Sequence, residues 1–316
     1  MSLNSGPLIS ELFHRIGIVY NPLAGGLKGS GRARLDTAVA TFRAAGSKVQ
    51  LFATSAPNHA GELACAAAAS GCTLILAAGG DGTINEVVNG IAGSCIPFGA
   101  LPSGTANVLA NEIGLATRPD YAARQLLEAT AIRIPLGRLE RQGHPTRYFA
   151  LMAGIGLDAK IVYHLDLNLK QRFGKLAYWH GGFLHLRGKL PRFETIVNGE
   201  SYQGSFTLVT KVRNYGGDFE IARHVKLMDA DFEVVIFQKN TWPAYIKFLG
   251  GVMLDRLREI DGVIIRRASS VQVQAPEDTR IYLQTDGEAV GALPATLGTL
   301  PDALTLLVPH KYLSHV

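Results

Sequence analysis

Residues 73–86, Thr-Leu-Ile-Leu-Ala-Ala-Gly-Gly-Asp-Gly-Thr-Ile-Asn-Glu, say more about this chain than any other segment. The apolar run from Thr73 to Ala78 predicts a buried strand, and the apolar spacing after the glycines predicts a helix. In such a strand, glycine turn and helix, the N–H groups at the helix start can face a bound phosphate. Because glycine has no Cβ, the backbone can approach the anion closely. The segment therefore predicts a phosphate-binding loop, with an ordinary tight turn as the alternative.

Asp81 stands directly after this predicted strand and its two glycines. Carboxylate oxygens are the ligands that Mg²⁺ prefers, and nucleotides bring this cation to their sites. We therefore expect Asp81 to lie near a magnesium ion carried on a bound nucleotide.

The composition predicts two globular domains, because 316 residues exceed the usual size of a single core. Apolar residues make up 47% of the chain and charged residues 18%, which is typical of a globular protein with an ample core. The net charge of +5 suits anionic partners, but no dense run of Lys and Arg is present. Nucleic acid is therefore not expected as a partner.

Cys65, Cys72 and Cys95 have no CxxC spacing, so they are expected to be small buried thiols in a reducing compartment and not disulfide partners or metal ligands. The N-terminus lacks the pattern of a signal peptide, and the apolar stretch 63–78 is interrupted at Ser70-Gly71. These features predict a cytoplasmic protein that touches a membrane only transiently, at its inner face.

The first half of the sequence alternates strand-like and helix-like segments. Strands are expected at 15–20, 48–53, 73–78 and 98–101, and helices at 31–45, 58–69, after 83, and at 105–112. This alternation predicts an α/β domain with a parallel sheet and helices on both faces. Ligands of such sheets bind beyond the carboxyl ends of the strands. The candidate site loops are therefore 21–26, 79–85 and 102–107.

From about Pro135 the pattern changes to short β-like runs separated by turn residues, which predicts an antiparallel sandwich or barrel. The expected strands are 148–153, 205–211, 232–238, 262–266, 270–274, 280–284 and 304–308, and helices are expected only at 159–167 and 173–187. We expect an α/β domain over 1–136 and a β-rich domain over 137–303, with residues 304–316 able to pack back on the first.

An ordered set of motifs resembles the diacylglycerol kinase catalytic-domain family, which includes bacterial lipid kinases, sphingosine kinases and ceramide kinases. The motifs are Val-Tyr-Asn-Pro at 19–22, Gly-Gly-Asp-Gly-Thr-Ile-Asn-Glu at 79–86, Leu-Pro-Ser-Gly-Thr-Ala-Asn at 101–107 and Asp-Gly-Glu at 286–288. The resemblance runs from Ile16 to Pro309, which fits the compact bacterial type. It implies the two-domain architecture of lipid and NAD kinases, with a nucleotide-binding domain over 1–136 and a β-rich lipid-substrate domain over 137–303.

The resemblance also implies roles for individual residues. Asp81 would lie near the catalytic magnesium, and Glu288 would be the base that takes a proton from the lipid hydroxyl, a task that suits a carboxylate within hydrogen-bond reach. ATP contacts are implied for Asn21, Thr54, Gly79, Gly80, Asp81, Gly82, Thr83, Ile84, Asn85, Gly104 and Thr105.

Each of these motifs also has a purely structural interpretation. Asn21-Pro22 and Asp286-Gly287 are common turn sequences. Thr105 and Asn107 could cap the helix that follows them.

A structural magnesium site is a further implication of the resemblance, with the Asp229 side chain and the carbonyls of Lys226 and Asp231 as ligands. Here the segment reads Lys-Leu-Met-Asp-Ala-Asp, so Met228 and Ala230 stand where the family often has an acidic residue and a glycine. A solvated acidic turn is the alternative, because so few oxygen ligands seldom hold magnesium without several waters.

Residues 169–192 combine basic side chains, which include Lys170, Arg172 and Lys175, with aromatic and leucine side chains. Such a segment suits a membrane interface, and a core helix with its cations reaching water is the alternative. The expected partners are thus a lipid substrate and a membrane surface; the oligomeric state is open, with a homodimer as one candidate.

The resemblance therefore predicts an ATP- and Mg²⁺-dependent lipid kinase that acts on a hydroxyl of a diacylglycerol-like or sphingoid lipid. An NAD kinase-like enzyme shares the Gly-Gly-Asp-Gly-Thr core, but Ile84-Asn85-Glu86 and the late Asp-Gly-Glu favour the lipid kinase. A non-catalytic lipid- or nucleotide-binding relative is the other alternative, supported only by the altered metal segment.

Overall fold

The computed structural model describes residues 13–314 apart from 30, 158, 160–189 and 216–218. The chain divides into two compact units: unit 1 comprises Met1–Ile134 and Asp302–Val316, and unit 2 comprises Pro135–Pro301. Two strands, β5 (Thr130–Glu140) and β18 (Ala295–Val308), carry the chain from one unit into the other.

Unit 1 contains a parallel sheet in the order β2–β1–β3–β4–β18. Its strands are β1 (Arg15–Tyr20), β2 (Lys48–Ala53), β3 (Leu74–Gly79), β4 (Pro97–Pro102) and the last part of β18. Every residue of β3 and β4 is buried, as expected for central strands with both faces covered. This burial explains why residues 73–78 are apolar without alternation.

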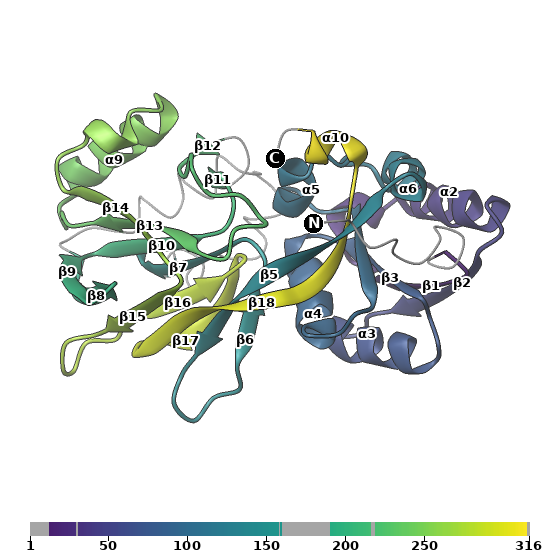
Figure 1. The fold of residues 1–316 in the computed structure, drawn as a ribbon, viewed down its shortest axis with the longest axis horizontal. Helices are drawn as coiled ribbons and strands as arrows, with labels where there is room; N and C mark the ends of the chain where they lie inside the picture. Colours follow the sequence, from purple (N-terminus) through teal and green to yellow (C-terminus); the bar gives the residue numbers. More distant parts are fainter. Residues whose placement is uncertain (1–12, 30, 158, 160–189, 216–218, 315–316) are drawn as a thin grey trace, which may run out of the picture. The chain divides into compact units, whose positions relative to one another are not determined.

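Helices cover both faces of the unit 1 sheet, so the predicted α/β architecture is confirmed (Figure 1). On one face, α2 (Gly31–Ala44) packs against α6 (Pro119–Leu127), and on the other α3 (Ala60–Ala69) packs against α4 (Asp81–Ile91). The shorter helices of this unit are η1 (Gly25–Leu27), α5 (Val108–Glu112) and α10 (His310–Leu313).

Unit 2 is an antiparallel β-sandwich, which confirms the second half of the fold prediction. One layer has the order β14–β13–β10–β7–β16–β17, and the other joins the first part of β18 to β15, β8 and β9, with β5 and β6 beside it. The strands are β6 (Arg147–Phe149), β7 (Met152–Gly156), β8 (Phe193–Val197), β9 (Glu200–Gly204), β10 (Phe206–Thr210), β13 (Phe232–Phe237), β14 (Val263–Ala268), β15 (Ser270–Gln274), β16 (Tyr282–Thr285) and β17 (Glu288–Ala292), together with the small hairpin of β11 (Asn214–Tyr215) and β12 (Phe219–Glu220).

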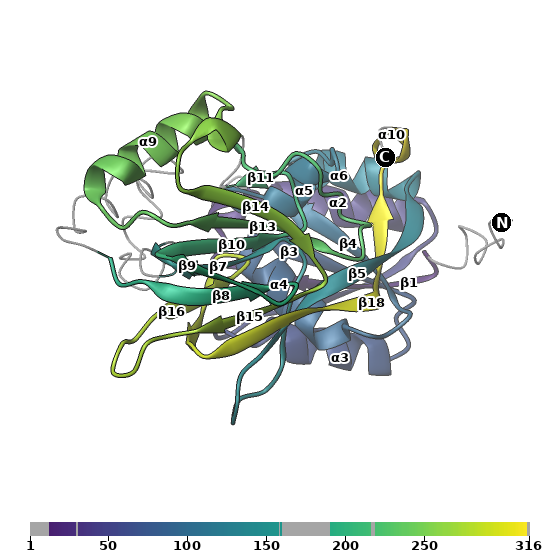
Figure 2. The same cartoon turned by 60° about the vertical axis from the view of Figure 1, so that its left-hand side comes forward.

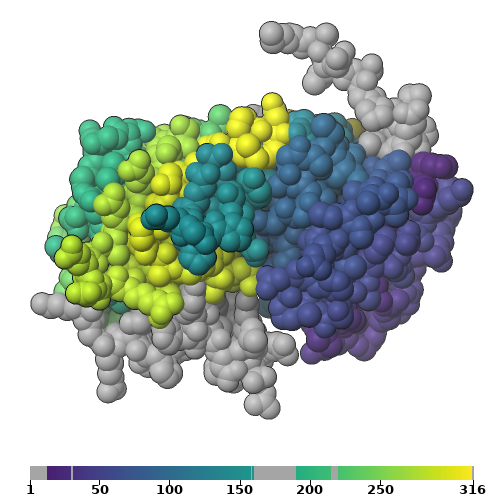
Figure 3. Space-filling model, turned by 90° about the horizontal axis from the view of Figure 1, so that it is seen from below, coloured from purple at the N-terminus to yellow at the C-terminus, as the bar shows by residue number. Residues whose placement is uncertain are grey.

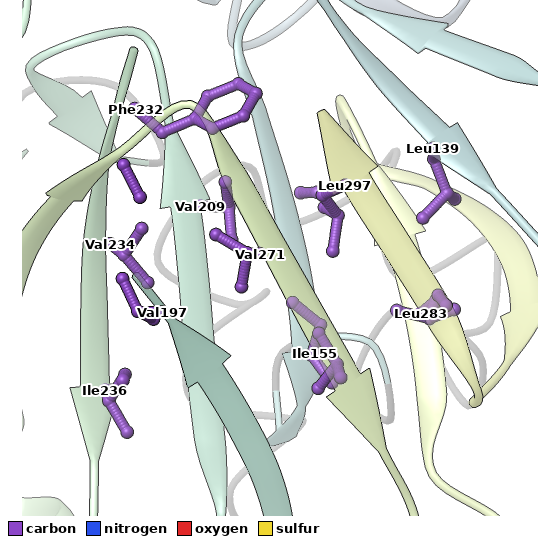
Figure 4. Close-up of a cluster of buried hydrophobic side chains, with 14 of the residues drawn as sticks. Leu139, Ile155, Val197, Val209, Phe232, Val234, Ile236, Val271, Leu283 and Leu297 are labelled. Atoms are coloured by element: carbon purple, nitrogen blue, oxygen red, sulfur yellow. The ribbon is translucent and has the colours of Figure 1, made fainter. Parts of the chain in front are cut away.

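The core of unit 2 lies between these two layers. Figure 4 shows Val234 and Ile236 of β13, Val271 of β15 and Leu297 of β18 in one cluster of buried side chains. In the space-filling view, the teal residues of the β5–β6 hairpin lie beside yellow residues of β18, with which β5 pairs (Figure 3). Burial of this cluster is the main source of stability for a sandwich of short strands.

Helix α9 (Trp242–Met253) is the clearest element that the sequence analysis missed, because helices after Pro135 were expected only at 159–167 and 173–187. Its Phe248 ring lies 4.8 Å from Phe237 and 5.7 Å from Phe206, so α9 covers β13 and β10 (Figure 2). The helices expected at 159–167 and 173–187 fall almost entirely outside the described residues.

Several boundaries also differ from expectation. The single strand expected at 148–153 is divided into β6 and β7. Helix α5 begins at Val108, not at Thr105, because Asn107 before it has a left-handed backbone with φ 48°. Strand β18 (Ala295–Val308) is longer than the expected 304–308. Its first part was not expected, because Pro301 and Asp302 interrupt the apolar pattern of the sequence. Within the part of the chain that the structure describes, no helix has the length and apolar character needed to cross a bilayer.

Candidate active site

The three candidate site loops lie at the carboxyl edge of the unit 1 sheet. Loop 1 (21–26) follows β1, loop 2 (79–85) follows β3, and loop 3 (102–107) follows β4. Since β3 pairs with both β1 and β4, loop 2 leaves the sheet between the other two. The arrangement is the one expected from the parallel order of the strands.

Backbone hydrogen bonds join the three loops. The Asn21 N–H donates to the carbonyl of Ala78 at 3.1 Å, which ties loop 1 to the end of β3. The Ser103 N–H donates to Gly79 at 2.8 Å, and the Gly26 N–H donates to Ser103 at 2.9 Å. The loops therefore form one connected backbone surface.

Glycines allow loops 2 and 3 to pack backbone against backbone. A Cβ on Gly104 would lie 2.5 Å from the Cα of Gly80, and a Cβ on Gly79 would lie 2.5 Å from Oγ1 of Thr83. Both distances are too short for any other residue. This edge of the sheet consequently presents backbone groups largely without side chains, as a phosphate site requires.

Asp81 is the first residue of α4, and its side chain is partly exposed. Its Oδ1 accepts a hydrogen bond from the N–H of Val108, the first residue of α5, at 2.8 Å. The carboxylate thus links loop 2 to the start of the helix after loop 3. It also lies at the N-terminal end of α4, where the helix dipole favours negative charge.

Asn107 closes loop 3 on itself. Its Oδ1 accepts from the Gly104 N–H at 2.8 Å, and its Nδ2 donates to the Gly104 carbonyl at 3.0 Å. Neither Asn107 nor Thr105 caps α5 through its side chain, since Asp81 accepts the Val108 N–H instead. Thr105 is exposed at the tip of the loop.

The remaining predicted nucleotide contacts have mixed surroundings. The Asn21 Oδ1 accepts from the Leu23 N–H at 2.9 Å, which is the turn chemistry named as its alternative. Thr54 is partly exposed beside β1, where its N–H donates to Tyr20 at 2.9 Å. The predicted contacts Thr83, Ile84 and Asn85, all in α4, are buried in the fold.

Glu86 has a structural role that the sequence analysis did not assign. Its two carboxylate oxygens accept from the N–H groups of Asn58 and Ala60, each at 2.9 Å, at the start of α3. His59, the N-cap residue, makes no side-chain cap of its own. The missing Ser, Thr or Asp before Ala60 was the available signal that another segment supplies the cap.

The Asp286-Gly287-Glu288 motif forms the hairpin turn between β16 and β17. Asp286 and Gly287 have positive φ values of 49° and 83°, as a two-residue hairpin turn requires. The Gly287 N–H donates to Oε1 of Gln284 at 2.7 Å. Glu288, the first residue of β17, pairs with Thr285 and is partly exposed.

The buried Asp286 carboxylate fixes this turn to a neighbouring segment of unit 2. Its Oδ1 accepts from the N–H groups of Leu151 and Met152 at 3.0 and 2.9 Å, and its Oδ2 accepts from Ala150 at 2.9 Å. Asp286 therefore fixes the turn that precedes Glu288. The sequence analysis did not recognise this contact, because its partners lie more than 130 residues away.

The expected metal ligands lie in the segment before β13. Arg267 of β14 donates to Oδ2 of Asp229 at 2.7 Å and to Oδ2 of Asp231 at 3.0 Å, and its guanidinium holds the pKa of Asp231 below its usual range. Burial lowers the pKa of Lys211 to about 8, although Asp229 and Asp231 oppose this shift. Among the described residues, no group of three or more His, Cys, Asp or Glu side chains is arranged to hold a metal ion.

Part of the predicted site lies outside the described residues. The basic and aromatic segment 169–192 is described only from residue 190.

Each half of the chain matches the model of a known protein family. Residues 15–139 match the model of the diacylglycerol kinase catalytic domain. Residues 152–308 match the model of the YegS C-terminal NAD kinase beta sandwich-like domain.

Full-length relatives cover nearly the whole chain. A diacylglycerol kinase of Bacillus subtilis (strain 168) is 31% identical over 94% of this chain and 97% of its own length. One from Mycobacterium tuberculosis is 26% identical over 97% of this chain and 99% of its own length. A solved structure of a diacylglycerol kinase from Bacillus anthracis str. Sterne has the same fold, with a TM-score of 0.76 at 22% identity, covering 95% of this chain and 98% of that one.

Proposed function

The chain belongs to the diacylglycerol kinase family and is a lipid kinase, and on this basis we propose that it transfers the γ-phosphoryl group of ATP to a hydroxyl of a diacylglycerol-like lipid. The observation that carries the proposal is the glycine-lined edge of unit 1, where loops 1, 2 and 3 are joined through their backbones with Asp81 at the helix start. The names of the relatives make diacylglycerol the first substrate to test.

In this proposal, loops 2 and 3 hold the phosphates of ATP. The N–H groups at the start of α4 carry the positive end of the helix dipole, so they favour an anion there. The donor set also fits magnesium, because the partly exposed Asp81 offers carboxylate oxygen at the same place. Magnesium brought with ATP would neutralise phosphate charge, and the loops would orient the γ-phosphoryl group.

Glu288 is the proposed general base. It would take the proton of the lipid hydroxyl as that oxygen forms its bond to the γ-phosphorus, and ADP would leave with the electron pair of the broken bond. The anchoring of its turn through Asp286 supports this role, since a base must be held within hydrogen-bond reach of its proton.

The substrate class is tested with labelled ATP and separate acceptors. We expect phosphorylation of diacylglycerol and none of NAD. A phosphorylated sphingoid base in place of diacylglycerol would move the assignment within the lipid kinases. Turnover of NAD alone would contradict the proposal and favour the NAD kinase alternative.

The two proposed catalytic carboxylates are tested by Asp81→Ala and Glu288→Gln. Each variant should keep the fold, because both side chains are partly exposed, but lose activity by about a hundred-fold or more. Circular dichroism and the initial rate with diacylglycerol measure the two effects. Wild-type rates in either folded variant would refute its assigned role.

Contact with a membrane is part of the proposal, because the acceptor lipid lies in a bilayer. Besides segment 169–192, helix α9 supports it: Trp242, Ile246 and Met253 share one helix face and are 40%, 53% and 66% exposed. An exposed apolar stripe of this kind suits the headgroup region of a membrane. We place the protein in the cytoplasm, at the inner face of the membrane. Sedimentation velocity would show whether it is a monomer or the homodimer that the sequence analysis left open.

Removing the cations Lys170, Arg172 and Lys175 tests the electrostatic part of this contact. Each Lys or Arg near an anionic surface contributes about 1 kcal/mol, so binding to phosphatidylglycerol vesicles should weaken by roughly a hundred-fold. A control variant lacks the exposed cations Arg43, Lys48 and Lys311 and should bind as wild type. Equal vesicle co-sedimentation of all three proteins would exclude docking through segment 169–192.

A further inference from the structure

The segment 222–231, between β12 and β13, is held by cationic side chains of the protein itself. Its tightest part is the turn from Lys226 to Asp229. The Asp229 N–H donates to the Lys226 carbonyl at 2.9 Å, and the Lys226 N–H donates to Oδ2 of Asp229 at 3.0 Å. Two oxygens that the family resemblance assigns to a magnesium ion therefore already accept hydrogen bonds within the turn.

Arg267 binds both carboxylates of the segment from the adjacent strand. In the sheet, β14 pairs with β13 and Arg267 lies opposite Glu233, so its side chain is close to Asp231, the residue directly before β13. Its Nη2 donates to Asp229 at 2.7 Å, and its Nε donates to Asp231 at 3.0 Å. Nη2 also contacts Oδ1 of Asp231, and Nη1 donates to the His224 carbonyl. The planar guanidinium thus occupies the centre of the oxygen-rich segment.

Lys211 supplies a second cation from the end of β10. Its side chain is fully buried, and its Nζ donates to the carbonyl of Asp229 at 2.6 Å. The ammonium also lies over the Phe232 ring, 5.7 Å from its centre, which is a favourable cation–π contact. Asp229 therefore meets one cation through its side chain and another through its backbone.

The donor set does not fit a divalent cation. Magnesium requires near-octahedral coordination by oxygen atoms, and N–H donors cannot serve as ligands. The charges of the Asp229 and Asp231 carboxylates are already matched by Arg267 and Lys211. A dication would add two positive charges beside a guanidinium that cannot lose its proton.

We infer that Arg267, together with Lys211, takes the place of a structural metal ion in segment 222–231. The segment keeps its conformation without any bound divalent cation, and the magnesium requirement of the proposed reaction is confined to the nucleotide. The inference concerns folding and metal binding, so it holds or fails independently of the substrate assignment.

The experiment uses the full chain, stripped with EDTA and free of nucleotide. Manganese binding is followed by electron paramagnetic resonance, and the Tm is measured in EDTA and in millimolar Mg²⁺. Wild type should show the same Tm in both and no manganese that depends on Asp229. Arg267→Ala should lower the Tm in EDTA by roughly 5 °C, and Mg²⁺ should restore part of it, because two carboxylates lose their cation.

Arg266→Ala is the matched control, because Arg266 is the neighbouring residue on β14 and points to the other face of the strand. Its Nε donates to the Tyr202 hydroxyl at 2.9 Å, away from the segment. Its Tm should be the same in EDTA and in Mg²⁺.

The inference is overturned by two results together. Wild type would bind one manganese ion per chain and have a lower Tm in EDTA than in Mg²⁺, and Asp229→Asn would show neither manganese binding nor this difference in Tm. This wild-type result decides the matter even if Arg267→Ala does not fold. If Asp229→Asn still binds manganese, that ion lies elsewhere in the chain. Together with a wild-type Tm that is the same in EDTA and in Mg²⁺, this result upholds the inference.

Discussion

At the scale of single residues, Asp286 combines a buried charge with a strained backbone. Its carboxylate accepts three backbone N–H groups, and its φ of 49° lies in the left-handed region. Only Asn and Asp among ordinary side chains adopt this region readily, because their short polar groups bond locally. The residue therefore sets both the direction of the turn and its attachment to the 150–152 segment, two positions before Glu288.

Replacing Asp286 by Asn should separate these two functions. Asn tolerates the backbone, but its Nδ2 would face the Ala150 N–H, so one buried donor loses its acceptor. We expect the free energy of unfolding to fall by about 2 kcal/mol and activity to fall roughly tenfold, since the turn carrying Glu288 is loosened. Urea unfolding and initial rates measure both.

Asp278→Asn is the control for this change, because Asp278 also has a left-handed φ of 59° but is exposed. It should match wild type in both measurements. If Asp286→Asn were as stable as wild type, the anchoring role of the carboxylate would be refuted.

At the scale of elements, the loops of unit 1 depend on the close approach of two strand ends. Loops 2 and 3 meet at Gly80 and Gly104, and Asp81 then joins α4 to the start of α5. The site is therefore a property of two strand–loop–helix units together, and neither unit alone has the same surface.

Gly104→Ala tests this close approach. The added Cβ would lie 2.5 Å from Gly80 Cα and 3.0 Å from Oδ1 of Asn107, so loops 2 and 3 must separate. We expect the KM for ATP to rise about tenfold, because misplacement of binding groups by even 1 Å is costly. Steady-state kinetics with varied ATP measure it.

Gly250→Ala provides the comparison, since a Cβ on this glycine of α9 meets no atom within 4 Å. Its KM should be unchanged, and the free energy of unfolding should rise by up to about 1 kcal/mol, because Ala favours helix over Gly. An unchanged KM for ATP in Gly104→Ala would mean that loops 2 and 3 do not form the nucleotide site.

At the scale of the whole molecule, the last strand, β18, runs from unit 2 into unit 1. The division at Pro301 and Asp302 falls inside β18, so its first part belongs to unit 2 and its last part to unit 1. Leu304, Leu306 and Val308 are buried in unit 1, where β18 pairs in parallel with β4. Unit 1 therefore needs residues that the chain supplies only after unit 2.

A chain that ends at Pro301 should fail to fold in unit 1. Each buried Leu or Val contributes about 1.5–3 kcal/mol, and a domain has only about 5–15 kcal/mol in total. We expect loss of helical circular dichroism and aggregation on size-exclusion chromatography. A chain that ends at Leu313 keeps β18 and α10 and should behave as the full chain. A folded, ATP-binding product of the shorter truncation would contradict the division into units.

The sequence by itself determined the features that depend on neighbouring residues. The glycine turn at 79–82, the alternation of strands and helices around it, and the change to short strands after Pro135 all follow from local spacing. Segment 73–78 was recognisable because both faces of β3 are buried, which removes the usual alternation. The convergence of loops 1, 2 and 3 followed from the parallel order of those strands.

Only the tertiary structure decided the contacts between distant segments. Glu86 of α4 caps α3, and Asp286 anchors a hairpin to the 150–152 segment. Arg267 binds Asp229 and Asp231, which the sequence analysis had considered as a solvated acidic turn. Helix α9 was missed for a related reason, since its Tyr245 and Phe248 face aromatic residues of β10 and β13. Such partners are specified by packing in three dimensions, and no periodicity along the chain records which of many carboxylates or rings will meet.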